Sequence, residues 1–127
     1  MAFLDKWGDN MKLKEFDILL DLKKSRKIEE FEVVQGDCDT NVFNIKITNE
    51  GKEYLIGDNT IEIAFKRPAS AALIQNNVTV TDNKIRCILD TDIIAVPGKV
   101  LGEVRIKNDN ILLTSSQFEF YVRQSIR

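Results

Sequence analysis

The chain has 127 residues, of which 43% are hydrophobic and 30% are charged, and its formal net charge is −2. This length suits one domain whose hydrophobic core folds without a metal or a disulfide. The slight negative charge disfavours nucleic acid as a partner. No apolar run approaches the roughly 20 residues that a membrane-spanning helix needs, so we expect no membrane insertion.

Residues 1–12 differ from the rest of the chain. Phe3, Leu4, Trp7 and Met11 fall at helical spacing, which predicts a short amphipathic helix ahead of a domain formed by residues 13–127. These four residues are candidate partner-docking residues. Three alternatives stay open for the segment: it packs on the domain's own sheet, it docks on a neighbouring subunit, or it is a disordered leader with Met11 as an alternative start.

The N-terminal segment does not resemble a signal peptide, because Asp5, Lys6 and Asp9 interrupt its apolar residues. We therefore expect the protein to be made in a cytoplasm, where thiols stay reduced. Cys87 alternates in phase with core residues and Cys38 lies in a polar loop, at a spacing that fits no zinc pattern. Two free thiols are the expectation, and one disulfide between the loop and a core strand is the alternative.

From residue 13 onward, apolar and polar residues alternate one by one in short stretches. In the last of them, Phe118, Phe120 and Val122 share one face while Glu119 and Tyr121 point the other way, as in a strand with one buried face. The expected strands, in chain order, are 15–23, 28–34, 42–48, 60–66, 78–81, 84–90, 100–107, 111–113 and 118–123.

Turn residues such as Asn, Asp and Gly separate these stretches, and 92–96 resembles a single helical turn. Together they predict an all-β fold, an immunoglobulin-like β-sandwich of about eight short antiparallel strands with a short N-terminal helix. Gly102 is expected at a bulge or a close crossing. The residues expected in the core are Phe43, Ile45, Phe65, Ile85, Leu89, Val104, Phe118 and Phe120.

The chain contains no histidine. This excludes Ser-His-Asp and Cys-His nucleophilic sites and His-ligated metals. The sequence Asp37-x-Asp39-x-Asn41 matches the first ligand positions of a calcium loop, but Val42 stands where that loop needs glycine and Thr48 where it needs glutamate. We interpret it as a turn in which Asp37 bonds nearby backbone amides. No metal, cofactor or catalytic residue is expected, and the protein is predicted not to be an enzyme.

Two further groups of residues have structural interpretations. Asp90 and Asp92 form a carboxylate pair at the end of a strand, where capping of the helical turn explains them better than acid–base chemistry does. Tyr54, Tyr121 and Trp7 could stack sugars or bases, but no basic stripe accompanies them.

Four stretches of the chain resemble the N-terminal domain of the phage baseplate upper protein family, whose members occur in siphophages of Gram-positive hosts. They are FDILLDL at 16–22, VVQGDCDTNVFNIKI at 33–47 with its QGD turn, PGKVLGEVRI at 97–106 and TSSQFEFYV at 114–122. The resemblance covers most of the chain, and its motifs are turns and strands that contain no chemistry.

The resemblance implies a virion structural module of a phage or prophage tail baseplate, which anchors host-recognition components through protein–protein contacts. Its implied partners are other baseplate or tail proteins, and it is expected to form a homo-oligomer in the assembled particle. Family members continue into a C-terminal region that holds receptor-binding proteins. Since this chain stops at Arg127, we expect either an isolated N-terminal domain or a natural short form. The alternative function is a carbohydrate-binding or adhesion module on a cell surface.

Overall fold

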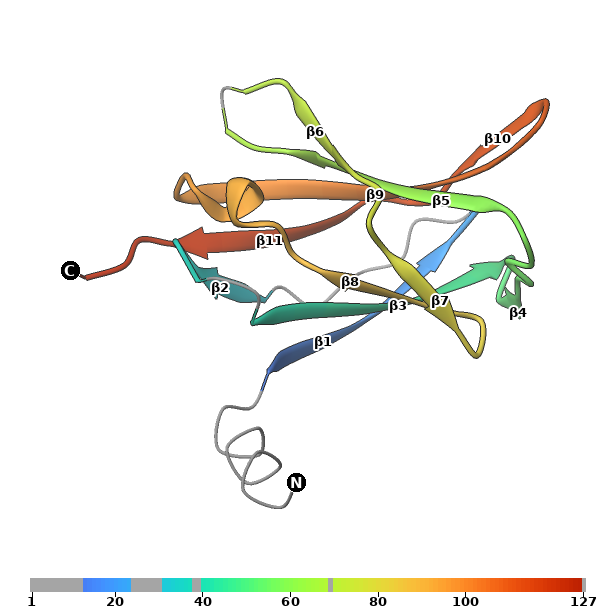
Figure 1. The fold of residues 1–127 in the computed structure, drawn as a ribbon, viewed down its shortest axis with the longest axis horizontal. Helices are drawn as coiled ribbons and strands as arrows, with labels where there is room; N and C mark the ends of the chain where they lie inside the picture. Colours follow the sequence, from blue (N-terminus) through green and yellow to red (C-terminus); the bar gives the residue numbers. More distant parts are fainter. Residues whose placement is uncertain (1–12, 24–30, 38–39, 69, 127) are drawn as a thin grey trace, which may run out of the picture.

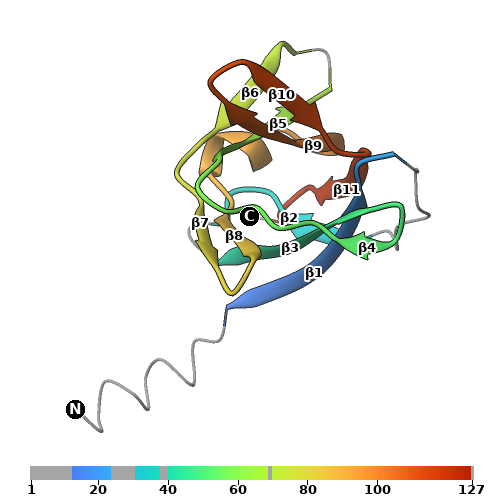
Figure 2. The ribbon, with the colours of Figure 1, turned by 90° about the vertical axis from the view of Figure 1, so that its right-hand side faces the viewer.

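The structure, a computed structural model, describes residues 13–23, 31–37, 40–68 and 70–126. These residues form eleven strands and one 3-10 helix, η1 (Thr91–Ile94). The strands make two sheets that face each other (Figures 1 and 2). Sheet A contains β1 (Lys14–Asp21), β3 (Asn41–Asn49), β4 (Lys52–Glu53), β7 (Thr79–Thr81) and β8 (Lys84–Ile88). Sheet B contains β2 (Glu32–Val34), β5 (Thr60–Lys66), β6 (Ala72–Gln75), β9 (Gly98–Asn108), β10 (Ile111–Thr114) and β11 (Phe118–Arg123).

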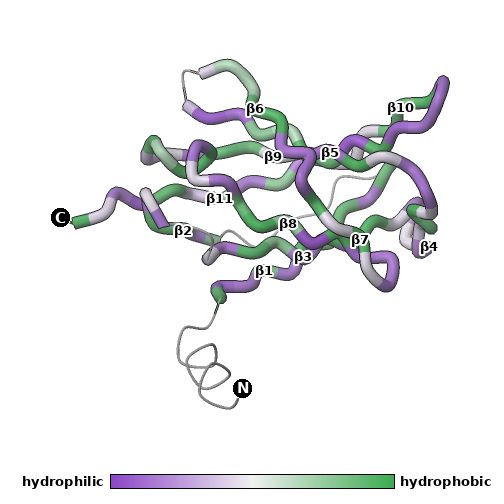
Figure 3. Tube along the Cα trace, viewed as in Figure 1, coloured by the Kyte–Doolittle hydropathy of each residue, from purple (hydrophilic) through white to green (hydrophobic). Residues whose placement is uncertain are grey.

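The predicted all-β sandwich is confirmed. The expected strands 60–66 and 118–123 coincide with β5 and β11, and the others differ from the observed bounds by a few residues. The first residues of the expected strand 28–34 and the predicted N-terminal helix lie outside the described residues. Two strands, β4 and β6, were not expected. The alternation of hydrophobic and hydrophilic residues on which the prediction depended can be followed along the strands in Figure 3.

The predicted antiparallel arrangement is wrong for two strand pairs. β1 runs parallel to β3, with Phe16 opposite Phe43, and β2 runs parallel to β11, with Val33 opposite Val122. Alternation specifies which face of a strand is buried, but it carries no information about strand direction. Here the chain leaves sheet A after β1, adds β2 to sheet B and returns to sheet A as β3. Each sheet therefore contains both parallel and antiparallel strand pairs.

The core between the sheets is built around Phe43, which is fully buried. Its ring contacts phenylalanines of both sheets, at centroid distances of 5.2 Å to Phe120 and 5.9 Å to Phe118. Most of these contacts are edge-to-face, the geometry that aromatic quadrupoles favour. All eight residues expected in the core are buried: Phe43, Ile45, Phe65, Ile85, Leu89, Val104, Phe118 and Phe120.

A bulge separates β10 from β11, although both strands pair with the same edge of β9. Thr114 lies opposite Arg105 and Phe118 opposite Gly102, so the three residues 115–117 face the two residues 103–104. The Ser115 side chain compensates for the interrupted ladder, because its Oγ accepts a hydrogen bond from the Val104 N–H at 2.9 Å. Gly102 was expected at a bulge or a close crossing, and it lies beside this bulge.

Two buried polar residues join the sheets at their edges, Asp21 through its backbone and Gln75 through its side chain. Asp21, at the end of β1, accepts a hydrogen bond on its backbone oxygen from the Ser116 N–H at 2.9 Å. Gln75, on β6, donates to the Ile88 oxygen at 2.5 Å and accepts from the Asp90 N–H at 3.2 Å. Because buried polar groups are costly unless they are paired, these bonds specify how the sheet edges meet.

The predicted turn at Asp82-Asn83 is confirmed as the two-residue connection between β7 and β8. Both residues have positive φ, 52° and 60°, as type I′ hairpin turns require.

The helical turn predicted at 92–96 is present as η1. Asp90 occupies its N-cap position but its side chain makes no capping hydrogen bond, so the expected capping role is wrong in that detail. The backbone N–H of Asp90 donates a hydrogen bond to the side-chain oxygen of Gln75.

Candidate docking surfaces

The candidate docking residues Phe3, Leu4, Trp7 and Met11 lie outside the described residues. The structure therefore does not place them, and their docking role stays a prediction. The surfaces that the structure does describe are the outer faces of the two sheets.

The described residues include the Cys87 thiol and many carboxylates, which are the kinds of side chain that act as nucleophiles or as metal ligands. Burial raises the pKa of the Cys87 thiol from its ordinary value of 9.0 to about 12, with a smaller contribution from the Asp90 carboxylate. Cys87 is a free cysteine, and a thiol this buried is a poor nucleophile because it stays protonated. Cys38 lies outside the described residues. In the described ranges, no group of three or more Asp, Glu, Cys or His side chains could hold a metal ion.

The Gly36-Asp37 turn is present, with φ of 81° at Gly36 and a hydrogen bond from the Asp37 N–H to the Val34 oxygen at 3.2 Å. The side chain of Asp37 differs from the expectation. Within the described residues it bonds the Lys14 ammonium at 2.9 Å rather than backbone amides. It thereby ties the turn after β2 to the start of β1.

The aromatic residues considered for sugar stacking do not form a platform in the described structure. Tyr121 is 53% exposed on the outer face of sheet B. Tyr54 is half-buried and packs against the core, and Trp7 lies outside the described residues. Since a stacking platform needs several exposed rings, Tyr121 alone does not provide one.

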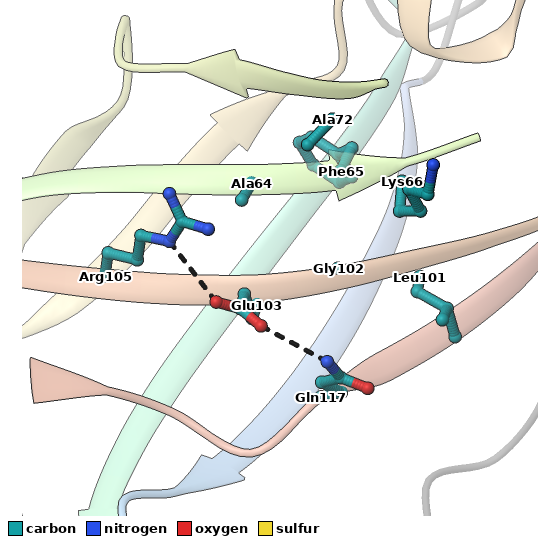
Figure 4. Close-up of a pocket in the computed structure, with 9 residues that line it drawn as sticks. All are labelled: Ala64, Phe65, Lys66, Ala72, Leu101, Gly102, Glu103, Arg105 and Gln117. Atoms are coloured by element: carbon teal, nitrogen blue, oxygen red, sulfur yellow. Dashed lines mark hydrogen bonds and ion pairs between the residues drawn. The ribbon is translucent and has the colours of Figure 1, made fainter. Parts of the chain in front are cut away.

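The outer face of sheet B has a shallow hollow of about 150 Å³ at its centre. Ala64 gives it a low floor because its side chain is small, and the backbone of Gly102 also lines it. Glu103 lies on its rim, where its two carboxylate oxygens accept hydrogen bonds from Arg105 Nε and Gln117 Nε2, each at 3.2 Å (Figure 4). Glu103, Arg105 and Gln117 on this rim are hydrogen-bonded to one another. A partner would therefore meet a concave surface with few free hydrogen-bonding groups.

The outer face of sheet A has a second hollow, of about 270 Å³, over β1, β3 and β8. Its lining consists of Asp17, Ile18, Leu19, Asn44, Lys46 and Lys84. None of these residues is conspicuous in the sequence. The polar ones lie in the outward phase of the alternating strands, but polar side chains in that phase also form ordinary solvated surface, so the pattern does not distinguish a docking face.

Residues 14–127 match the family described as the BppU N-terminal domain. Among solved structures, the N-terminal domain of phage TP901-1 ORF48 is similar, with a TM-score of 0.72 and 12% sequence identity over 87% of this chain and 98% of that chain. At this identity the likeness shows a shared fold. No curated protein sequence matches the chain.

The family match extends over most of the sequence, and the chain therefore belongs to the BppU N-terminal domain family, the N-terminal domain of phage baseplate upper proteins. It is a structural module of a phage tail baseplate, so it is part of the virion tail and contacts other tail or baseplate proteins. None of the helices in the described ranges has the length and apolar character to cross a membrane.

Proposed function

We propose that this domain anchors host-recognition components to the phage tail by protein–protein contacts. The family match over residues 14–127 is the observation that carries this proposal. A rigid sandwich supports it, because docking on an unstrained sheet face loses little conformational freedom in the protein. In this role the domain positions the host-recognition components, and its surfaces provide the binding affinity.

The segment 1–12 is a separate docking element in this proposal. The family match begins at residue 14, which supports a boundary between this segment and the sandwich. Twelve residues are too few to stay helical alone in water, so a helix formed by Phe3, Leu4, Trp7 and Met11 must pack on another surface. Tryptophan is enriched among the residues that dominate binding energy at protein interfaces.

The domain acts without catalysis and as one of several copies in the particle, after synthesis in the host cytoplasm. The complete lack of histidine and the buried, protonated Cys87 support the non-catalytic part. The repeated architecture of oligomeric assemblies supports the multiple copies, because one docking surface then serves every subunit.

A binding measurement tests the proposal. Tail particles assembled without this chain are immobilised, and the purified protein is passed over them while association is followed by interferometry. We expect saturable binding at a fixed number of copies per particle. Capsids purified in the same way are the control surface, and equal binding to capsids and tails would contradict an anchoring role.

A further inference from the structure

The outer faces of the two sheets differ in how their cations are neutralised. On sheet B, each lysine or arginine that points outward from β5 and β9 has a partner. Lys66 donates to the Ser70 oxygen. The ion pairs are Lys99–Glu119 at 3.6 Å, Arg105–Glu103 at 3.2 Å, Arg105–Glu62 at 3.7 Å and Lys107–Glu62 at 3.0 Å. On this face, each of these cations therefore has an ion pair or a hydrogen bond within the domain itself.

On the face of sheet A formed by β1, β3 and β8, Lys14 and Arg86 have ion pairs, and two other cations have no such partner among the described residues. Ile45 lies opposite Ile85, and one residue further in the same antiparallel register Lys46 lies opposite Lys84. Both lysines are exposed, and neither has an ion pair or a hydrogen bond in the part of the chain that the structure describes. Like charges directly opposite each other on neighbouring strands destabilise a sheet. The free protein therefore carries a repulsion here that a bound anion would relieve.

The two lysines border the hollow of about 270 Å³ on this face, here named the lysine hollow. The other polar side chains at the hollow are engaged with each other, because Asn44 Nδ2 lies 3.3 Å from Glu15 Oε1 and 3.5 Å from Asp17 Oδ1. Leu19 lies opposite Lys46 on β1 and adds a half-buried apolar side chain. Among the residues that line the lysine hollow, Asp17 is a single carboxylate against two lysines. The hollow therefore keeps an excess of positive charge, and beside it lies a small apolar surface.

We propose that the lysine hollow receives a carboxylate side chain, flanked by an apolar residue, that projects from another protein of the baseplate. The carboxylate would bridge Lys46 and Lys84, and the apolar neighbour would cover Leu19. This inference rests on the proposed function, because it names the surface and the chemistry of that docking.

Two other occupants fit the face less well. A polyanion such as nucleic acid is recognised by an extended basic stripe, whereas the unpaired positive charge in the lysine hollow is confined to two lysines. A second copy of this chain would present the same hollow, and two hollows placed face to face do not fill each other. A projecting side chain from a different protein fits both the shape and the charge.

Paired charge-removing variants test the inference. Lys46→Gln/Lys84→Gln removes two charges from sheet A, and Lys99→Gln/Lys107→Gln removes two outward charges from sheet B as the matched control. Each is assayed for binding to immobilised tail particles that lack the chain, and for its thermal midpoint. We expect the sheet A variant to lose about tenfold or more in affinity with an unchanged or raised midpoint, because it loses a repulsion. The control should keep its affinity and show a lowered midpoint, because it loses ion pairs.

Lys46→Arg/Lys84→Arg should retain most of the binding, since it keeps the charge. If the wild type binds the particles and Lys46→Gln/Lys84→Gln binds equally well, the inference is overturned while the proposed function stands. If the wild type itself does not bind, the proposed function fails first. If sedimentation velocity shows that the sheet A variant loses self-association and not particle binding, the occupant is a second copy and the assignment to another protein is wrong.

Discussion

Gly102 and Phe118 lie directly opposite each other on β9 and β11, and a Cβ atom at position 102 would lie only 2.4 Å from Cζ of Phe118. The Phe118 ring is buried and contacts Phe43, Phe65 and Phe120, so it cannot move aside freely. Glycine is therefore required here by the space that the ring occupies. We expect Gly102→Ala to lower the free energy of unfolding by about 1–3 kcal/mol, as overpacking of a core does, in urea denaturation.

A double-mutant cycle distinguishes this steric cause from a backbone effect. Phe118→Leu shortens the side chain opposite position 102, so Gly102→Ala should cost less in the Phe118→Leu background than in the wild type. Residues in contact commonly show coupling of about 0.5–3 kcal/mol. Strict additivity of the two substitutions would count against the close approach.

Asp21 is 1% exposed, and its carboxylate accepts hydrogen bonds from three donors within the described residues. They come from the Thr48 hydroxyl at 2.7 Å, the Lys23 N–H at 2.9 Å and the Gly51 N–H at 3.0 Å. Asp21→Ala leaves these donors without the carboxylate, and we expect a loss of at least about 2 kcal/mol in the free energy of unfolding. Asp21→Asn should lie between alanine and wild type, because one acceptor oxygen becomes a donor.

The control for this series is Asp17→Asn, since Asp17 is exposed on the same strand. Its stability should stay within about 0.5 kcal/mol of wild type. Chemical denaturation of the four proteins side by side gives the comparison, and an Asp21→Asn protein as stable as wild type would show that the network contributes little.

The buried thiol of Cys87 predicts an alkaline loss of stability. Its pKa is raised to about 12 in the folded protein from an ordinary 9.0, so the folded state holds its proton more tightly than the unfolded chain does. The stabilisation is complete below pH 9 and is lost as the pH rises from 9 towards 12. We expect the free energy of unfolding of wild type to fall more steeply over this range than that of Cys87→Ala.

Lysines and tyrosines titrate in the same range, so the informative quantity is the difference between the two proteins. A constant difference between wild type and Cys87→Ala from pH 8 to pH 11 would mean that the thiol ionises as easily in the folded state as in the unfolded chain.

Deleting residues 1–12 tests the role of Phe3, Leu4, Trp7 and Met11. We expect the thermal midpoint to stay nearly unchanged and the affinity for tail particles, or for other copies of the chain, to fall more than tenfold, which corresponds to about 1.4 kcal/mol. Asp5→Asn/Asp9→Asn, which keeps the apolar stripe, is the control. A strongly lowered midpoint would assign the stripe to the domain's own core, and unchanged binding would leave the sheet faces as the docking sites.

The alternating pattern was sufficient to predict the core and most strands, because the burial of Phe43, Phe118 and Phe120 depends on local periodicity. β6 was not predicted, because its buried residue is Gln75 and its exposed residues include Ile74. Gln75 is tolerated inside because it bonds the end of β8, a contact between distant segments that periodicity cannot reveal. Strand direction was unpredictable for the same reason.

The candidate site was less predictable than the fold. The importance of Lys46 and Lys84 comes from their position opposite each other on β3 and β8, and this cross-strand register appears only once the strands are paired. In the sequence they are two solvent-facing lysines among many. The leader residues were found because helical spacing is a local signal, but local spacing does not say which surface they contact.

The central claim is that this domain is built into the tail baseplate as a docking module. Immunogold labelling of intact virions, with antibodies raised against the purified domain, measures its position most directly. The account predicts gold particles at the distal end of the tail, and none on virions assembled without the chain. Labelling of the capsid, or of the host surface in place of the virion, would contradict it.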